Sequence, residues 1–272
     1  MTTNTTSHPA TAQIKHESLY PEGKQDLIQV ENVTVVFDGF KALDIHLFGV
    51  DKNELRVVIG PNGAGKTTLC DVISGKTPVT SGRVVFDNVD ITDYRETDIA
   101  ALGVGRKFQT PTVFDSLTVY QNMELALPKR WKVWQNFFGH ETAQEREEIH
   151  HLLERVHLIE VRDLPAKSLS HGQRQWLEIS MLMVSRPKLL LVDEPAAGLT
   201  DKETALTAEL LNELKGSHTI MVIEHDMEFV RQLASRVTVL CEGKILADGP
   251  LDKVQADAKV IEAYLGRGKE RK

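Results

Sequence analysis

The residues best suited to chemistry in this chain form a glycine-rich stretch, residues 60–68, which reads Gly-Pro-Asn-Gly-Ala-Gly-Lys-Thr-Thr. An apolar run at residues 55–59 precedes it, and a helix-forming stretch that begins at Thr68 follows it. Glycines between a strand and a helix let successive backbone N–H groups curl around a phosphate, and the helix N-terminus adds partial positive charge. This phosphate segment therefore predicts a site for a nucleoside triphosphate.

Two side chains of the phosphate segment have distinct expected tasks. Lys66 is placed to reach the β- and γ-phosphates as a point charge, and the Thr67 hydroxyl is placed to ligate the Mg²⁺ that travels with ATP or GTP. A chance glycine-rich turn is the alternative, which the strand and helix on either side disfavour. The residues expected to contact the nucleotide are Gly60, Pro61, Asn62, Gly63, Ala64, Gly65, Lys66, Thr67 and Thr68.

A pair of acids ends a second apolar run. Residues 189–192 read Leu-Leu-Leu-Val and are followed by Asp193 and Glu194. In a phosphate-loop fold the first acid at such a strand end normally faces the Mg²⁺, so Asp193 is a candidate metal ligand together with Thr67. Glu194 lies one residue nearer the γ-phosphate, where a carboxylate can polarise an attacking water. Taken alone, the pair is also compatible with an ordinary surface turn.

The elements that must position these residues follow from hydrophobic periodicity. Short runs of alternating β-branched and polar residues between positions 27 and 87 predict antiparallel hairpins. From residue 188 onward, apolar runs alternate with helical patterns, which predicts a parallel sheet covered by helices. The middle of the chain is polar and helical. It contains an aromatic cluster, residues 131–138, which either packs inside a helical subdomain or contacts a membrane subunit or lipid.

Composition narrows the class of protein. The 272 residues are 41% hydrophobic, and no run approaches the roughly 18 uncharged apolar residues of a spanning helix, so a membrane role requires a partner. Lys and Arg number 32 against 39 Asp and Glu, a net charge of −7 that argues against a broad nucleic-acid-binding surface. Cys70 and Cys241 lie far apart without metal-binding spacing, which predicts small buried residues in a reducing cytoplasm.

Further motifs make the chain resemble the ATP-binding subunits of ABC transporters. Residues 169–173, the signature turn, read Leu-Ser-His-Gly-Gln upstream of Asp193, and His225 lies downstream of it. With the phosphate segment and the acid pair, these motifs stand in the family's order. The resemblance implies an α/β P-loop NTPase fold with a parallel sheet core, an antiparallel β subdomain and a helical subdomain at about residues 112–185.

The same resemblance assigns the signature turn to the ATP held by an opposite subunit. Ser170, Gly172 and Gln173 match its nucleotide-contacting residues, whereas His171 departs from the usual glycine. Asp201 matches the loop that crosses the dimer interface. The resemblance thus implies that one chain holds half of each ATP site.

The remaining roles are also carried over by resemblance. Gln109 matches the glutamine that senses Mg²⁺ and the attacking water, and His225 matches the histidine that hydrogen-bonds the γ-phosphate. Phe37 matches the aromatic residue that stacks on adenine, although Phe40 competes for that role and Phe37 is also a candidate core residue. The expected catalytic set is Glu194, His225, Lys66 and Gln109, and the expected metal set is Thr67, Gln109 and Asp193.

The resemblance also implies partners and a location. A second ATPase subunit, identical or paralogous, and two membrane permeases are expected at the cytoplasmic face of the inner membrane, with a solute-binding protein acting indirectly and no nucleic acid. We expect residues 1–25 to form a disordered tail, residues 26–267 the ATPase domain and residues 268–272 a basic tail.

Several segments resemble the importers of branched-chain amino acids and urea, namely residues 105–114, 193–199, 223–227 and 260–266. Residues 168–178 most resemble the urea-importer ATPases, so urea is the expected solute. A branched-chain amino-acid importer ATPase is the first alternative, and a soluble ABC ATPase of iron–sulfur assembly is a more distant one.

Overall fold

The computed structural model describes residues 26–107, 113–128, 142–233 and 236–266. Four predictions concern residues outside these ranges, namely the tail at residues 1–25, Gln109, the aromatic cluster at residues 131–138 and the basic tail at residues 268–272. They stay predictions.

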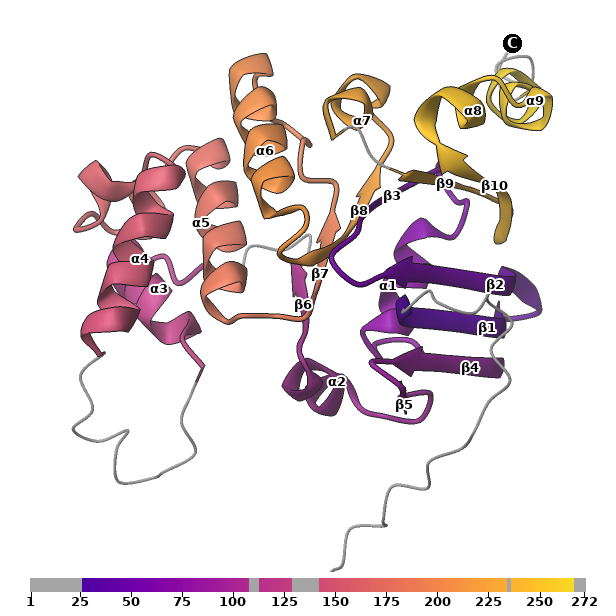
Figure 1. The fold of residues 1–272 in the computed structure, drawn as a ribbon, viewed down its shortest axis with the longest axis horizontal. Helices are drawn as coiled ribbons and strands as arrows, with labels where there is room; N and C mark the ends of the chain where they lie inside the picture. The colour runs from indigo at the N-terminus through magenta and orange to yellow at the C-terminus, as the bar shows by residue number, and fades with distance from the viewer. Residues whose placement is uncertain (1–25, 108–112, 129–141, 234–235, 267–272) are drawn as a thin grey trace, which may run out of the picture.

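A six-stranded sheet forms the centre of the molecule (Figure 1), with the strand order β10-β9-β3-β8-β7-β6. All neighbours pair in parallel except β10, which is antiparallel to β9. Every residue of β3, β7 and β8 is buried, as expected for parallel strands covered on both faces. The strands are β3 (Leu55–Ile59), β6 (Val104–Lys107), β7 (Leu189–Asp193), β8 (Thr219–Glu224), β9 (Arg236–Cys241) and β10 (Lys244–Pro250).

An antiparallel sheet with the order β2-β1-β4-β5 lies beside this centre (Figure 1). Its strands are β1 (Asp26–Phe37), β2 (Phe40–Asp51), β4 (Ser81–Phe86) and β5 (Val89–Asp90). A two-residue turn, Asp38 and Gly39, joins β1 to β2, and both residues have the positive φ angles that such hairpins favour. The predicted hairpins are therefore present.

Helices cover both faces of the central sheet. They are α1 (Lys66–Ile73), α2 (Glu96–Leu102), α3 (Val119–Ala126), α4 (Ala143–Arg155), α5 (His171–Val184), α6 (Asp201–Leu214), α7 (Met227–Leu233), α8 (Leu251–Gln255) and α9 (Ala258–Gly266), with short 3₁₀ turns at Ile159–Val161 and Ala166–Ser168. Capping boxes begin α3, α4, α5 and α6, in which an N-cap hydroxyl and the side chain three residues later satisfy each other's backbone N–H groups.

The two faces of the central sheet contribute to two separate hydrophobic cores, and alternate residues of β7 belong to different cores. Leu190 and Val192 pack with apolar residues of α3 to α7, whereas Leu189 and Leu191 pack with α1 and the antiparallel sheet. Helices α1 and α5 therefore cover opposite faces, and Figure 1 shows them on different sides of β6 and β7. This alternation also directs Asp193, the next residue of β7, to the α1 face.

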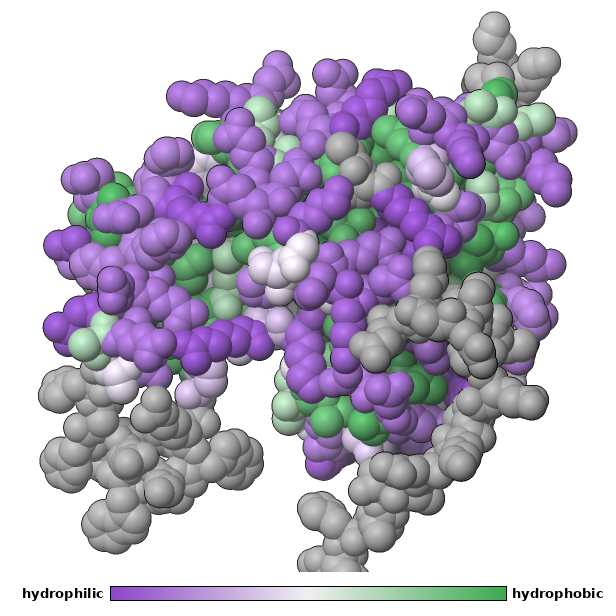
Figure 2. All heavy atoms as spheres, in the orientation of Figure 1, coloured by the Kyte–Doolittle hydropathy of each residue, from purple (hydrophilic) through white to green (hydrophobic). Residues whose placement is uncertain are grey.

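The surface in Figure 2 is mostly hydrophilic, with apolar residues in scattered groups. Among the described helices, none is long and apolar enough to cross a membrane. The fold confirms the predicted parallel core, antiparallel sheet and helical middle. Strands β5 and β10 and helices α2, α8 and α9 were not expected from the sequence.

Candidate functional site

The phosphate segment connects β3 to α1 and fits closely against two other strands. A Cβ on Gly60 would lie 2.1 Å from the carbonyl oxygen of Leu240 in β9. Gly65 has a φ of 100°, and a Cβ there would lie 2.7 Å from the carbonyl oxygen of Ala42 in β2. Both positions therefore require glycine, because the loop backbone approaches its neighbours more closely than a side chain allows.

Lys66 opens α1 and folds back over the loop. Its ammonium group donates to the carbonyl oxygens of Gly60 at 2.8 Å and Pro61 at 3.1 Å, and the residue is 7% exposed. Burial lowers the pKa of Lys66, while the negative charges of Glu194 and Asp193 oppose that shift. The lysine thus lies at the loop that it is predicted to serve.

Asp193 is a buried carboxylate at the carboxyl end of β7. The residue is 4% exposed, and neither carboxylate oxygen has a hydrogen-bond partner within the described part of the chain. Burial raises its pKa, Arg106 opposes the shift and Glu194 adds to it. Asp193 is thus an unpaired buried carboxylate that interacts electrostatically with Lys66. Carboxylate and hydroxyl oxygens are ligands that Mg²⁺ accepts, so Asp193 and Thr67, the residue after Lys66, fit a magnesium site by their chemistry.

Glu194 begins a tight turn, residues 194–197, which we call the carboxylate turn. Its φ is 48°, an uncommon value for a residue with a side chain, and its N–H donates to the carbonyl of Ile223 at 3.0 Å. The N–H of Ala197 donates to the Glu194 carbonyl at 3.2 Å and closes the turn. Glu194 Oε1 lies 3.3 Å from His225 Nδ1, so the structure brings the predicted acid and histidine together.

Glu224 is a residue of this site that the sequence reasoning missed. It ends β8, is 1% exposed, and its Oε1 accepts from the N–H of Ala196 at 3.1 Å. Its Oε2 accepts from the N–H groups of His225 at 2.9 Å and Asp226 at 3.3 Å. One buried carboxylate thus holds the carboxylate turn and the His225 backbone together. The sequence did contain a signal for Glu224, because it ends an apolar strand in the same way as Asp193 ends β7.

Arg106 is a second residue that was missed. It lies in β6 at 9% exposure, forms an ion pair with Asp71 of α1 at 2.5 Å, and donates to the Ser74 hydroxyl at 2.8 Å. Its positive charge opposes the rise in the pKa of Asp193. Arg106 therefore ties the strand that leads toward Gln109 to the helix that follows the phosphate segment.

The signature turn begins α5. The Ser170 hydroxyl accepts from the Gln173 N–H at 3.2 Å, and Gln173 Oε1 accepts from the Ser170 N–H at 3.0 Å. Gly172 is buried, and a Cβ there would lie 2.2 Å from Oε1 of Glu203 in α6. Because α5 and α1 cover opposite faces of the sheet, the structure does not bring the signature turn to the phosphate segment of the same chain.

The two candidate adenine-stacking residues lie on either side of the hairpin turn between β1 and β2. Phe37 is 48% exposed and Phe40 is 67% exposed, and the two are cross-strand partners. The start of β2 approaches the phosphate segment, since Gly65 lies against Ala42. Phe40 precedes Ala42 by two residues and pairs with Phe37, so both exposed residues stay candidates.

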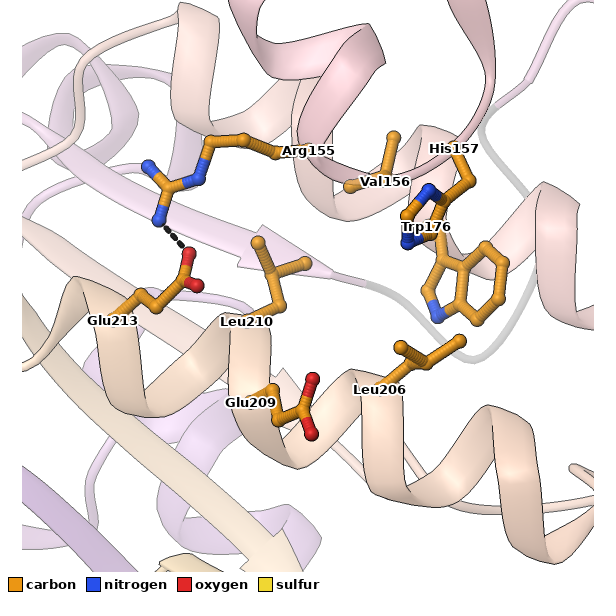
Figure 3. A pocket seen from close by; sticks show the side chains of 8 residues that line it. All are labelled: Arg155, Val156, His157, Trp176, Leu206, Glu209, Leu210 and Glu213. Carbon is orange, nitrogen blue, oxygen red and sulfur yellow. Dashed lines mark hydrogen bonds and ion pairs between the residues drawn. The ribbon is translucent and has the colours of Figure 1, made fainter.

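A cavity of about 230 Å³ lies elsewhere, between α4, α5 and α6 (Figure 3). Arg155 forms an ion pair with Glu213 across it, and the Trp176 ring forms part of its wall. The Trp176 indole N–H donates to the Thr207 hydroxyl at 2.9 Å and fixes α5 to α6. None of the predicted site residues lines this cavity.

Comparison with known families identifies the class. The model of the ABC transporter family matches residues 43–197, and that of the branched-chain amino acid ATP-binding cassette transporter matches residues 244–270. The first match spans more than half of the chain and includes both the phosphate segment and the acid pair. The chain therefore belongs to the ABC transporter family as an ATP-binding subunit, an enzyme that hydrolyses ATP to power transport.

Relatives place the chain in one branch of that family, the ATP-binding subunits of branched-chain amino acid transporters. It is 34% identical to the high-affinity branched-chain amino acid transport ATP-binding protein BraF of Pseudomonas aeruginosa, over 88% of this chain and 98% of that protein. It is equally similar to LivG of Escherichia coli, over 89% and 98%. The expected resemblance to this branch of importers is confirmed. The expected urea specificity is not supported by these relatives, which fit the first alternative better.

Solved structures agree with this placement. The ADP conformation of an ATP-binding cassette of an ABC transporter superposes with a TM-score of 0.77 at 32% identity, covering 89% of this chain and 99% of that chain. A nucleotide-free cassette gives 0.76 at 31% identity, covering 88% and 99%. A dimeric bacterial ABC transporter cassette gives 0.70 at 25% identity, covering 82% and 98%.

Proposed function

We propose that this chain is the ATPase of an importer for a small polar solute, docked on two membrane permeases at the cytoplasmic face of the inner membrane. The role in import is supported by the relatives. The observation that carries the ATPase role is the grouping of Asp193, Glu194 and His225 at the carboxyl ends of β7 and β8. Asp193 is coupled electrostatically to Lys66, and Glu194 lies 3.3 Å from His225. Such a group can bind a triphosphate and direct water to its terminal phosphorus.

Binding rests on the phosphate segment. Its backbone N–H groups surround the β-phosphate, and Lys66 exchanges its bonds to the Gly60 and Pro61 carbonyls for bonds to phosphate oxygens. Asp193 and Thr67 would hold Mg²⁺, with Gln109 as the further expected ligand. When bound, the ion neutralises phosphate charge and helps orient the γ-phosphate.

Hydrolysis rests on the carboxylate turn. Glu194 orients and polarises the attacking water, and the strained backbone of Glu194 fixes where its carboxylate points. His225 donates a hydrogen bond to the γ-phosphate, and Glu224 holds the backbone of both loops. The chain's own residues thus supply water activation and charge stabilisation at one site.

The complete ATP site requires a second subunit. The signature turn covers the other face of the sheet and its Ser170 is exposed, so it is available to a nucleotide held by another chain. In this arrangement Ser170, Gly172 and Gln173 present the N-terminal end of α5 to the partner's γ-phosphate, while Asp201 lies at the interface. Two ATP molecules then hold the dimer closed, and hydrolysis releases it.

For the solute, we propose a branched-chain amino acid, because the relatives that cover nearly the whole chain serve such transporters. Urea is the second candidate, carried by the resemblance of residues 168–178 to the urea-importer ATPases. The ATP site does not distinguish the two candidate solutes, because its groups would contact the nucleotide and not the transported solute.

The hydrolytic role is tested with Glu194→Gln, which keeps the size of the side chain but removes its negative charge. We expect the variant to bind ATP and to form a stable ATP-bound dimer, while turnover falls by at least about a hundredfold. Size-exclusion chromatography with ATP and phosphate-release kinetics measure the two properties. Retained turnover would remove Glu194 from this role. The dimer would be contradicted if both the wild-type and the variant chain stayed monomeric with ATP in the presence of the partner ATPase subunit.

The solute is tested by transport rather than by ATPase assays. The chain is purified with its permeases and reconstituted in vesicles together with the solute-binding protein, and uptake of radiolabelled leucine is compared with uptake of radiolabelled urea. ATP-dependent leucine uptake alone supports the first candidate. Urea uptake alone overturns it in favour of the second.

A further inference from the structure

The side chain of His171, which replaces the usual glycine of the signature turn, reaches the carboxylate turn of the same chain. Its Nε2 lies 3.2 Å from the carbonyl oxygen of Ala197. A carbonyl can only accept, so this hydrogen bond requires the proton on Nε2. The ring also covers Gly198, where an added Cβ would lie 3.3 Å from Nε2.

A second residue of α5 contacts the same turn one helical turn further on. The Gln175 side-chain amide donates to the carbonyl oxygen of Pro195. His171 and Gln175 are four residues apart and therefore lie on one face of the helix. Gln175 is buried at 6% exposure, whereas His171 is exposed. Gln175 is thus an internal packing contact, and His171 is a contact that can change without opening the core.

The carboxylate turn is consequently held from two sides. Helix α5 binds its carbonyls at Pro195 and Ala197, and Glu224 of β8 accepts from the N–H of Ala196. The Ala197 N–H in turn donates to the carbonyl of Glu194. A displacement of His171 therefore reaches Glu194 through two consecutive hydrogen bonds.

We propose that His171 is a positioning residue that couples the signature turn to Glu194 within one chain. This inference rests on the proposed dimer, in which the signature turn contacts the partner's ATP while Glu194 acts on the chain's own ATP. Closure of the signature turn on one nucleotide then sets the orientation of the carboxylate that acts on the other. His171 contacts neither nucleotide in this role, and it makes the two sites cooperative.

The test uses the wild-type ATPase and His171→Ala, assembled in each case with its partner ATPase subunit and permeases. We expect kcat to fall by about threefold to tenfold and the Hill coefficient for ATP to move toward one, with little change in KM, because the link biases catalysis rather than binding. His171→Gln, which keeps a side-chain N–H donor, should recover part of both properties. Recovery by the donor distinguishes positioning from loss of packing.

A matched control is His46→Ala. His46 is an exposed residue of β2 that contacts Asn32 in the antiparallel sheet, remote from both turns in the chain's hydrogen-bond network. We expect its kinetics to equal those of the wild type. Hydrogen exchange of the purified full-length chain is a measurement that does not require the dimer. The backbone amides of Glu194, Ala196, Ala197 and Gly198 should exchange faster in His171→Ala than in the wild type or in His46→Ala.

Unchanged exchange together with unchanged kcat and Hill coefficient in His171→Ala would overturn the link. An ATP-stabilised dimer of Glu194→Gln in the same experiments would show that the proposed function had survived that failure. Conversely, a Glu194→Gln chain that stays monomeric with ATP in the presence of its partner ATPase subunit would contradict the dimer itself, and with it the coupling between two sites. The two failures are therefore distinguishable.

Discussion

The phosphate segment and the signature turn are proposed to contact ATP from two sides, the second in the partner's site, and the two segments are held in the chain in different ways. The phosphate segment is enclosed: Gly60 and Gly65 lie against the backbones of two other strands, and Lys66 is buried. In the signature turn, Ser170 and His171 are exposed, and their side chains form the cap of α5 and the hydrogen bond to Ala197. The phosphate segment, the enclosed half of the proposed ATP site, is therefore preorganised by the fold of its own chain. The signature turn, the exposed half, would form a site only together with a partner subunit.

The carboxylate turn shares features with both segments. Like the phosphate segment, it is held by buried contacts, with Glu224 of β8 and with Gln175 of α5. It also contacts the exposed signature turn, through the hydrogen bond between Ala197 and His171. If Glu194 acts in hydrolysis as proposed, the contacts that hold it lie mostly inside one chain, and His171 is the exposed contact through which its position would be adjusted.

The largest effect is expected from a substitution that disrupts the phosphate segment. In Gly60→Ala the new Cβ would lie 2.1 Å from the Leu240 carbonyl, so the loop backbone has to move. We expect loss of measurable ATP binding and a decrease of about 2–4 kcal/mol in the free energy of unfolding. Fluorescent-nucleotide titration and urea denaturation measure these quantities. Gly249→Ala, where an added Cβ meets nothing within 4 Å, is the control and should bind ATP normally.

The second prediction concerns the anchor of the carboxylate turn. The two carboxylate oxygens of Glu224 accept hydrogen bonds from three backbone N–H groups. In Glu224→Gln only one oxygen remains as an acceptor, and the new NH₂ group faces backbone donors. We expect about a 10- to 100-fold loss of kcat with little change in ATP affinity, and a loss of about 1–3 kcal/mol of stability. Glu228→Gln, an exposed acid of α7, is the matched control. A Glu224→Gln enzyme with normal kcat would show that this anchor is dispensable.

The third prediction separates two aromatic residues at the rim of the enclosed half. If Phe37 stacks on adenine, Phe37→Ala should raise KM for ATP by about tenfold, because stacking of a base on an aromatic ring contributes about 1–3 kcal/mol. Phe40→Ala serves as its control and should change KM little. Steady-state kinetics over a range of ATP concentrations decide between them, and a larger effect at Phe40 would transfer the role to that residue.

These residues also show how far the sequence alone reaches. Strand β3 and the glycines after it were predicted because strand, loop and helix are contiguous in sequence, and the local pattern suffices. Glu224 was missed because its function depends on the loop after β7, which tertiary folding brings to the end of β8. His171 could be flagged only as a departure from the family's usual glycine. Its contact with Ala197 spans 26 residues and requires the packed structure.

The smallest effect on the isolated chain is expected from a substitution in the signature turn. Ser170→Ala removes the hydroxyl that caps α5 and should cost about 1 kcal/mol of stability without changing the affinity of the isolated chain for ATP.

Thr142→Ala is a closely matched control, because Thr142 caps α4 through the same kind of box, accepting from the Glu145 N–H at 3.2 Å. Both substitutions should lower the free energy of unfolding alike. In the Glu194→Gln background, however, only Ser170→Ala should abolish the ATP-stabilised dimer seen by size-exclusion chromatography. If both variants or neither lost the dimer, the exposed serine would be a helix cap and nothing more, and the partner would have to recognise the nucleotide through other residues of the signature turn.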